Sequence, residues 1–223
     1  MNRELKKRVF TSFILSIGIV FLIFIDPIIF KISLFLIIFI CYLEWSQFNV
    51  NYFKKKNKQN PSKYSLVKAL GLMYLIFVTF SAYNLRGDTF EDALFLTFII
   101  SICASSDIGG YVFGKFIGGK KLTKISPSKT ISGSLGSFIL SLISVPLFYY
   151  FLPEKFNNPY DLIILAIIVS FSCQLGDLFI SYLKRKAKVK DTGDLLPGHG
   201  GVLDRIDGIL FAVPIGILSL LIF

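Results

Sequence analysis

Residues 160–183 read YDLIILAIIVSFSCQLGDLFISYL, a long apolar run whose acidic side chains are Asp161 and Asp177. A helix of about 20 such residues is long enough to cross the hydrocarbon core of a bilayer. The composition extends this interpretation to the whole chain, because 54% of its 223 residues are hydrophobic and its mean hydropathy is +0.68. Soluble domains are usually about 45–50% apolar. We therefore expect an all-α polytopic membrane protein.

Apolar runs predict about seven transmembrane helices. They cover residues 9–25, 28–47, 66–84, 92–114, 131–152, 160–183 and 204–223. We expect the first run to be retained as a span, because no small-x-small cleavage site follows it. Since no linker-like stretch divides the chain, we expect a single integral-membrane domain over residues 1–223. The N-terminal helices cover residues 1–91, and a second helical bundle covers residues 92–223. This bundle includes two cytoplasmic loops, at residues 115–130 and 184–203.

The positive charges are distributed unevenly between the predicted connections. Of the 24 Lys and Arg residues, only Lys31, Arg86 and Lys155 lie on one side; the other 21 lie in the N-terminal segment and in alternate connections. Lys and Arg stay on the cytoplasmic side of a membrane because translocating them is costly. We therefore expect a cytoplasmic N-terminus and an external C-terminus in the inner (cell) membrane of a bacterial-type cell. The net charge of +10 would then lie mainly on the cytoplasmic side of the membrane.

Two of the basic connections differ from ordinary topology signals. Residues 114–133 read GKFIGGKKLTKISPSKTISG, and residues 181–208 read SYLKRKAKVKDTGDLLPGHGGVLDRIDG. Both mix cations with Gly, Ser, Thr and Pro, which permit turns and expose backbone N–H groups. Such backbone nests, together with helix N-termini and lysines, bind phosphate well. The two connections therefore predict a polyanionic ligand that arrives from the cytosol.

Asp107 lies inside the fourth predicted span, where an ionised carboxylate costs roughly 2.5–3.5 kcal/mol. Tyr111 stands four residues later and shares its helical face. Gly110 and Gly114 form a GxxxG pair, which lets a neighbouring helix approach closely. We expect Asp107 and Tyr111 to face a wet cavity and to contact a ligand. The alternative is a buried polar clamp between helices.

A second set of polar side chains flanks the 184–203 loop. One helical stripe combines a carboxylate, a hydroxyl and two amines. Its members are Asp177, Ser181, Lys184 and Lys188. Asp204 and Asp207 stand three residues apart at the start of the last predicted span, where acids also suit the positive end of a helix.

A turn at Pro197–Gly198 would let this loop fold back and bring Asp177 and Asp204 together. Two carboxylates beside lysines form a hard oxygen site of the type that Mg²⁺ prefers, completed by phosphate oxygens. His199, the only histidine, stands in the same turn. We interpret it as a donor to phosphate or as a residue that holds the loop in shape. A general base is not needed, because a phosphate nucleophile is already ionised near neutral pH.

The polar loop also carries a long pattern in a fixed register. It runs Ser181-x-x-Lys184-Arg185-x4-Lys190-Asp191-x5-Pro197-Gly198-His199-Gly200-Gly201-x-x-Asp204-Arg205-x-Asp207. This pattern resembles the signature of the CDP-diacylglycerol synthases, also called phosphatidate cytidylyltransferases. Residues 107–133 are similar to a second block of that family, an acid and a tyrosine ahead of Ser126-Pro127-x-Lys129-Thr130-x-x-Gly133. The two blocks cover about a quarter of the chain.

The resemblance implies transfer of CMP from CTP to phosphatidate, which gives CDP-diacylglycerol and pyrophosphate in phospholipid biosynthesis, with Mg²⁺. It implies that Asp177 and Asp204 hold the metal and that the catalytic set is completed by Lys184 and Arg205. It also implies substrate contacts from a larger group of residues. These are Asp107, Tyr111, Ser126, Lys129, Thr130, Ser181, Arg185, Lys190, Asp191, His199, Gly200 and Asp207.

The resemblance further implies a homodimer with a funnel open to the cytosol and the bilayer. Its partners would be CTP, phosphatidate and the lipid bilayer, and no nucleic acid is expected. A second, monovalent cation such as K⁺ is also implied. The chain departs from the family pattern at Ser132, where many relatives carry Glu or Gln, and at Ile180, where they carry an acid. A second cation site would therefore be built differently here.

Two alternative functions stay open on the sequence. A CTP-dependent polyprenol or dolichol-type kinase shares related blocks, but it attacks with a hydroxyl and transfers the γ-phosphate. An organic-anion transporter also uses intramembrane acids and basic rims, although no pair of broken spans in two repeat halves is visible.

Overall fold

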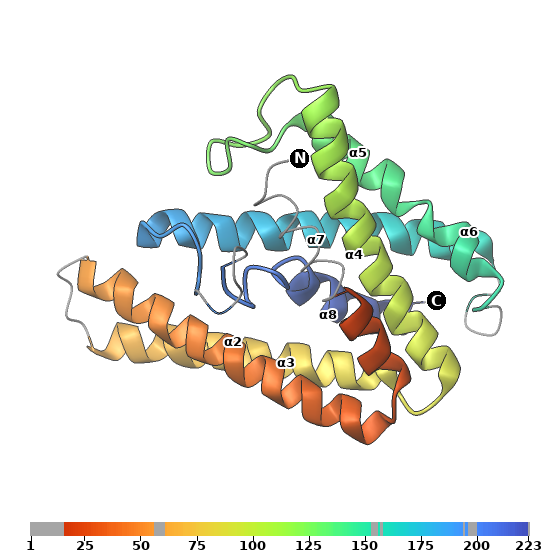
Figure 1. Ribbon diagram of the computed structural model, residues 1–223, viewed down its shortest axis with the longest axis horizontal. Coiled ribbons are helices and arrows are strands. Elements are labelled where there is room, and N and C mark those ends of the chain that lie inside the picture. The colour runs from red at the N-terminus through yellow and green to blue at the C-terminus, as the bar shows by residue number, and fades with distance from the viewer. Residues whose placement is uncertain are drawn as a thin grey trace. The chain divides into compact units, whose positions relative to one another are not determined.

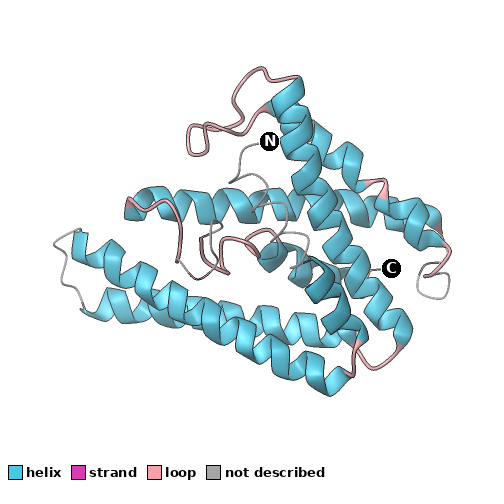
Figure 2. Ribbon diagram, in the orientation of Figure 1, coloured by secondary structure: helices cyan, strands magenta, loops and turns pink. Residues whose placement is uncertain are grey.

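The computed structural model describes residues 16–55, 61–152, 156, 158–193, 195 and 200–222. Within these residues the regular structure is helical (Figure 2). One isolated antiparallel bridge joins Lys121 to Thr130. The long helices are α2 (Pro27–Lys55), α3 (Pro61–Arg86), α4 (Phe90–Phe116) and α7 (Pro159–Ala187). The shorter ones are α5 (Ile131–Ser141), α6 (Ser144–Tyr149) and α8 (Ile209–Ser219) (Figure 1). Residues 16–24 are helical as well. The prediction of an all-α fold is confirmed.

Within the part of the chain that the structure describes, five helical segments are long and apolar enough to cross a membrane. They are Pro27–Phe53, Pro61–Arg86, Phe90–Phe116, Ile131–Tyr149 and Pro159–Ala187. The chain is therefore a multi-pass membrane protein, as the apolar runs predict. The count of seven spans and the sides of the two termini stay predictions.

The last helix differs from its predicted span, 204–223. Residues 202–208 form turns, closed for example by a hydrogen bond of 2.9 Å from Arg205 N to the Val202 carbonyl oxygen. The α-helix begins only at Ile209 and is 11 residues long. At 1.5 Å per residue such a helix is about 16 Å long, roughly half the thickness of the hydrocarbon core.

The chain folds into two compact units. The first unit comprises residues 1–83 and 184–206, and the second comprises residues 84–183 and 207–223. The expectation of a single domain over residues 1–223 stays a prediction.

In the first unit, α2 and α3 form an antiparallel pair (Figure 1). Near one end of the pair, the ring of Phe53 packs edge-on against that of Tyr64 at 5.7 Å between centroids. Near the other end, the Lys31 ammonium lies 4.4 Å from the centre of the Tyr83 ring. Between them Gly71 of α3 leaves room for an indole ring of α2, which a Cβ at that position would overlap.

In the second unit, α4 packs against α5, α6 and α8. Its first turn is stabilised by a capping box, in which Thr89 and Asp92 each bond the other's main-chain N–H. Large side chains on α4, among them Phe95, Phe98 and Ile99, are fully buried. This helix is therefore the centre of the unit's apolar core.

Glycines bring α4 and α5 into close contact. A Cβ on Gly109 would overlap the carbonyl oxygen of Gly136, and a Cβ on Gly133 would lie 2.7 Å from the carbonyl oxygen of Gly110. Gly114 lies close to Gly133. The prediction that Gly110 and Gly114 admit a neighbouring helix is confirmed. Small residues act in this way in membranes because van der Waals contact drives helix association there.

We expect Gly109→Leu to destabilise the second unit, because its side chain would have to displace the backbone of α5. Overpacking of this kind typically costs about 1–3 kcal/mol. The temperature at which half of the detergent-purified protein loses monodispersity should fall accordingly. Gly18→Leu is the matched control, since nothing lies within 4 Å of that helical glycine. Equal temperatures for the two variants would contradict the close contact.

Candidate active site

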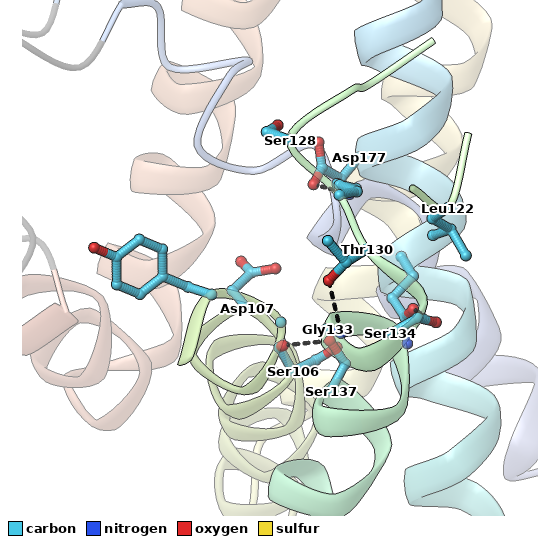
Figure 3. Close-up of a pocket in the computed structure, with 13 residues that line it drawn as sticks. Ser106, Asp107, Leu122, Ser128, Thr130, Gly133, Ser134, Ser137 and Asp177 are labelled. Carbon is cyan, nitrogen blue, oxygen red and sulfur yellow. Dashed lines mark hydrogen bonds and ion pairs between the residues drawn. The ribbon is translucent and has the colours of Figure 1, made fainter. Parts of the chain in front are cut away.

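The second unit contains a cavity of about 220 Å³ that is lined mostly by residues with polar side chains (Figure 3). Helices α4, α5 and α7 and the connection between α4 and α5 all contribute to its wall. The lining residues are Ser106, Asp107, Gly110, Tyr111, Leu122, Ser128, Lys129, Thr130, Gly133, Ser134, Ser137, Gln174 and Asp177. Five predicted site residues thus line one cavity, namely Asp107, Tyr111, Lys129, Thr130 and Asp177.

The central charged contact of this cavity joins Asp177 to Lys129 by an ion pair. The Ser181 hydroxyl donates to the other carboxylate oxygen of Asp177 at 3.2 Å. Both charged side chains keep about a quarter of their surface exposed, 29% for Asp177 and 26% for Lys129. The tertiary structure thereby joins two sequence blocks that are far apart in the chain, and it leaves the pair accessible to a ligand.

The connection before α5, residues 117–130, is closed by main-chain hydrogen bonds. Gly118 and Gly119 have positive φ angles of 64° and 101°, a region that favours glycine. The two halves of the connection are joined by hydrogen bonds of 2.8 Å from Leu122 N to the Lys129 carbonyl and 3.0 Å from Ile131 N to the Lys120 carbonyl. These bonds hold the loop that carries Lys129 together at the cavity wall.

Ser126 and Thr130 both organise this connection. Ser126 is buried, and its carbonyl oxygen accepts a bond of 3.1 Å from Lys129 N. Thr130 is the N-cap of α5, where its hydroxyl accepts from Gly133 N at 3.1 Å. The positive end of α5 consequently lies at the cavity wall, an arrangement that favours anions.

Asp107 and Tyr111 both have exposed side chains on α4, and Asp107 borders the cavity (Figure 3). The preceding residue, Ser106, makes two of the polar contacts that join α4 to its neighbours. Its carbonyl oxygen accepts from the Ser137 hydroxyl at 2.7 Å, and its hydroxyl accepts from that of Ser170 at 3.0 Å. Ser106 therefore has a structural role, and both the ligand role and the clamp role considered for Asp107 stay predictions.

Gln174 is a cavity residue that the sequence interpretation missed. Its Oε1 accepts from the Ser134 hydroxyl, whereas its buried Nε2 has no hydrogen-bond partner among the described residues. A buried donor without an acceptor costs about 1–3 kcal/mol. Because Gln174 also lines the cavity, its amide is a candidate donor to a ligand. A polar residue inside an apolar run, one turn before Asp177, is the sequence signal that would have indicated it.

A second charged cluster, in the first unit, is centred on Asp204. Its Oδ1 accepts from the Lys184 ammonium at 2.7 Å, and its Oδ2 accepts from Thr192 N at 2.7 Å and from Gly201 N at 3.1 Å. Burial by itself raises the pKa of this carboxyl group, but the Lys184 and main-chain donors outweigh it and hold the pKa below its usual value. Asp204 is therefore ionised at neutral pH.

Gly200 shapes the turn beside Asp204. Its φ is 81°, and a Cβ there would lie 2.8 Å from Oδ2 of Asp204 and 3.0 Å from the Cβ of Asp191. Four further predicted site residues of the first unit have exposed side chains. They are Arg185, Lys190, Asp191 and Arg205.

The remaining predicted positions lie elsewhere. Asp207 is half-buried in the second unit, and one of its carboxylate oxygens accepts from Gly208 N at 2.8 Å. His199 and the positions of the predicted turn, Pro197 and Gly198, lie outside the described residues. Their expected roles stay predictions.

The oxygen donors around Asp177 suit a hard divalent cation. Asp177 is accompanied by the hydroxyls of Ser128 and Thr130 in the cavity wall, and Mg²⁺ binds one or two carboxylates plus substrate phosphates rather than a full protein cage. Among the described residues, no group of three or more His, Cys, Asp or Glu side chains comes together. Asp177 and Asp204 belong to different units, so the shared site expected for them stays a prediction.

The chain is similar in sequence to a known protein family and to several of its members. The sequence model of the cytidylyltransferase family matches residues 49–223. The chain is 40% identical over 147 residues to the phosphatidate cytidylyltransferase of Staphylococcus haemolyticus, which is 66% of this chain and 52% of that protein. It is 43% identical over 124 residues to the protein of the same name from Bacillus subtilis, which is 53% of this chain and 45% of that protein. It is 44% identical over 117 residues to the phosphatidate cytidylyltransferase of Rickettsia bellii, which is 50% of this chain and 51% of that protein.

The chain spans about half the length of the curated relatives that it matches. The family match covers both sequence blocks and most of the described helices. It also confirms the resemblance found in the two blocks. The chain belongs to the cytidylyltransferase family.

Proposed function

We propose that the chain transfers CMP from CTP to phosphatidate and so forms CDP-diacylglycerol and pyrophosphate in phospholipid biosynthesis. The observation that carries the proposal is the cavity at which Lys129 of one block meets Asp177, just ahead of the other, in a chain that the cytidylyltransferase family matches. The names of the relatives, phosphatidate cytidylyltransferases, supply the substrates of the proposal.

The proposed reaction begins when a phosphate oxygen of phosphatidate attacks the α-phosphorus of CTP. The bond from that phosphorus to the oxygen bridging to the β-phosphate breaks, and pyrophosphate leaves with the electron pair. Two anions must approach each other, so positive groups fixed at the site lower the barrier. From the second unit, Lys129, the N-terminus of α5 and the Gln174 amide would bind the substrate phosphates and so bring the two anions together.

The first unit would add further positive charge. Its exposed Arg185, Lys190 and Arg205 side chains suit nucleotide or lipid phosphates, because Arg and Lys both bind phosphate through charge-assisted hydrogen bonds. Lys184 is held in place by Asp204. Positioning of the two reactants supplies much of the remaining catalysis in phosphoryl-transfer enzymes.

We also propose Asp177 and Asp204 as the ligands of Mg²⁺. When bound, the ion would offset charge on the reacting phosphates. A second, monovalent cation such as K⁺ completes the proposal. The two departures from the family pattern have structural roles here: the Ser132 hydroxyl donates to the Gly118 carbonyl oxygen at 2.5 Å, and Ile180 is buried. The second cation would therefore use other ligands.

The proposed site faces the cytoplasm from the inner membrane of a bacterial-type cell, in a homodimer. The proposed topology has seven spans, a cytoplasmic N-terminus and an external C-terminus. The distribution of Lys and Arg supports it, since the basic connections fall on one side. Large apolar side chains exposed on the long helices support contact with lipid. Among them are Phe35, Phe39, Leu70, Met73 and Phe80.

Labelled nucleotide tests this function against its alternatives. The purified protein would be incubated in detergent with phosphatidate, Mg²⁺ and CTP carrying radioactive phosphorus at either the α or the γ position. The proposal expects label in the lipid from the α position only. Transfer from the γ position to a polyprenol would instead identify the kinase alternative. Absence of any covalent transfer would contradict both enzymes and leave the transporter alternative.

Gln174→Met should raise the KM for one of the substrates roughly tenfold, because a hydrogen bond to a charged group is worth about 1.5–3 kcal/mol and Met keeps the side-chain volume. Initial rates at varied CTP and phosphatidate would measure it. Gln47→Met is the matched control, since Gln47 is an exposed glutamine on α2. Unchanged KM values for both substrates would contradict the proposed donor role of Gln174.

A further inference from the structure

Glu44 is a buried carboxylate that neither sequence block nor the cavity accounts for. It lies on α2 within the apolar segment Pro27–Phe53 and is 6% exposed. It also precedes residue 49, where the match to the family begins. An ionisable residue inside an apolar span is costly and therefore points to a specific role.

Both oxygens of Glu44 accept hydrogen bonds from one turn of the polar loop. Val202 N donates to Oε1 at 2.8 Å, and Leu203 N donates to Oε2 at 2.8 Å. Two glycines make room for the carboxylate. A Cβ on Gly201 would lie 2.5 Å from Oε2, and a Cβ on Gly193 would lie 3.0 Å from Oε1. The loop backbone is therefore shaped around this side chain.

The same turn carries Asp204 and Arg205. Three consecutive main-chain N–H groups, those of residues 201, 202 and 203, point to carboxylates: the first to Asp204 and the other two to Glu44. The bond from Arg205 N to the Val202 carbonyl closes the turn. All of these residues belong to the first unit. The orientation of Asp204 toward Lys184 thus depends on a turn that α2 holds in place.

We propose that Glu44 is a positioning residue, which fixes the 201–205 turn and so presents Asp204 and Arg205 to the substrates. The expected effect of Glu44 on turnover rests on the proposed function, whereas its hydrogen bonds to the turn do not depend on that function. A glutamine at this position has the same size but places an N–H₂ group against one of the two main-chain donors. One of the two hydrogen bonds is then lost, and two donors face each other.

Three variants of the full chain in detergent test the proposal. Glu44→Gln removes one acceptor. Gly201→Ala keeps the carboxylate of Glu44 but pushes it away from the loop, because the added Cβ of residue 201 would overlap Oε2 of Glu44. Cys41→Ala is the matched control, since Cys41 is equally buried and lies three residues earlier on α2. Comparable thermal midpoints for the three proteins establish that each is folded.

Amide hydrogen exchange of the segment 200–206 is the first measurement. We expect Glu44→Gln and Gly201→Ala to exchange at least about tenfold faster there than the wild type, since exchange reports local opening. Cys41→Ala should match the wild type. The second measurement is kinetic: for both test variants kcat should fall roughly 10–100-fold, as for residues that orient metal ligands, while the KM for CTP stays nearly constant.

Unchanged exchange in both test variants would overturn the proposal. Faster exchange with a kcat equal to that of the Cys41 control would also overturn it, because Glu44 would then be structural only. A wild-type protein that transfers no label would defeat the proposed function. The exchange data would in that case still decide whether Glu44 holds the turn.

Discussion

Asp204→Asn should leave the protein folded and membrane-inserted but reduce its CMP-transfer turnover at least roughly 100-fold, the loss typical when a main electrostatic group is removed from an active site. The carboxylate accepts from Lys184 at one oxygen and from Thr192 N and Gly201 N at the other. Asparagine has a single acceptor oxygen, so its N–H₂ group must face either the ammonium or the two main-chain donors. It also lacks the charge that a divalent cation requires.

Initial rates with α-labelled CTP would measure this loss in purified protein. Asp161→Asn is the matched control, because Asp161 lies in the first turn of α7 outside the cavity. The control should keep wild-type turnover. If Asp204→Asn keeps more than about a tenth of the wild-type rate, the proposed metal role is wrong, since metal-centred stabilisation is worth several kcal/mol.

Asp177→Asn should have an effect of similar size for a different local reason. Asp177 is the acidic partner of Lys129 at the cavity and accepts the Ser181 hydroxyl. Its replacement leaves the lysine without its partner and removes a carboxylate that the proposed cation needs. We expect kcat to fall at least roughly 100-fold, with the protein still inserted in the membrane.

Lys129→Met separates the two roles of this ion pair. It breaks the same contact but keeps the carboxylate, so it should mainly raise the KM for CTP and spare kcat more than Asp177→Asn does. Titration of both substrates in a steady-state assay distinguishes these outcomes. A kcat for Asp177→Asn above about a tenth of wild type would remove Asp177 from the proposed metal site.

Helical spacing along one segment does not identify the partners of two of these charges. It places Asp177, Ser181 and Lys184 on one stripe, and the Ser181 hydroxyl does contact Asp177. Lys184, however, pairs with Asp204, and Asp177 pairs with Lys129. Local spacing states which side chains share a helical face. It does not state which loop folds back against that face.

Glu44 and Gln174 show the same limit from the other direction. Each is a polar residue within an apolar run, so the sequence contains a signal that it is unusual. The role of each comes from its surroundings, main-chain N–H groups more than 150 residues away for Glu44 and a cavity wall for Gln174. No motif or period relates positions so far apart.

The sequence by itself determined that this chain is helical and apolar enough to cross a membrane, and it indicated the family through its two polar blocks. It also predicted that a helix packs closely at Gly110 and Gly114 of α4, because a glycine pair at helical spacing marks a helix surface, whereas the structure identified that helix as α5. Only the tertiary structure decided which lysine pairs with which aspartate. It also decided which main-chain N–H groups donate hydrogen bonds to the carboxylate of Glu44 on α2. The physical reason is that composition and periodicity act over a few residues, whereas hydrogen bonds and ion pairs form between whatever groups the packing of the helices brings within about 3 Å.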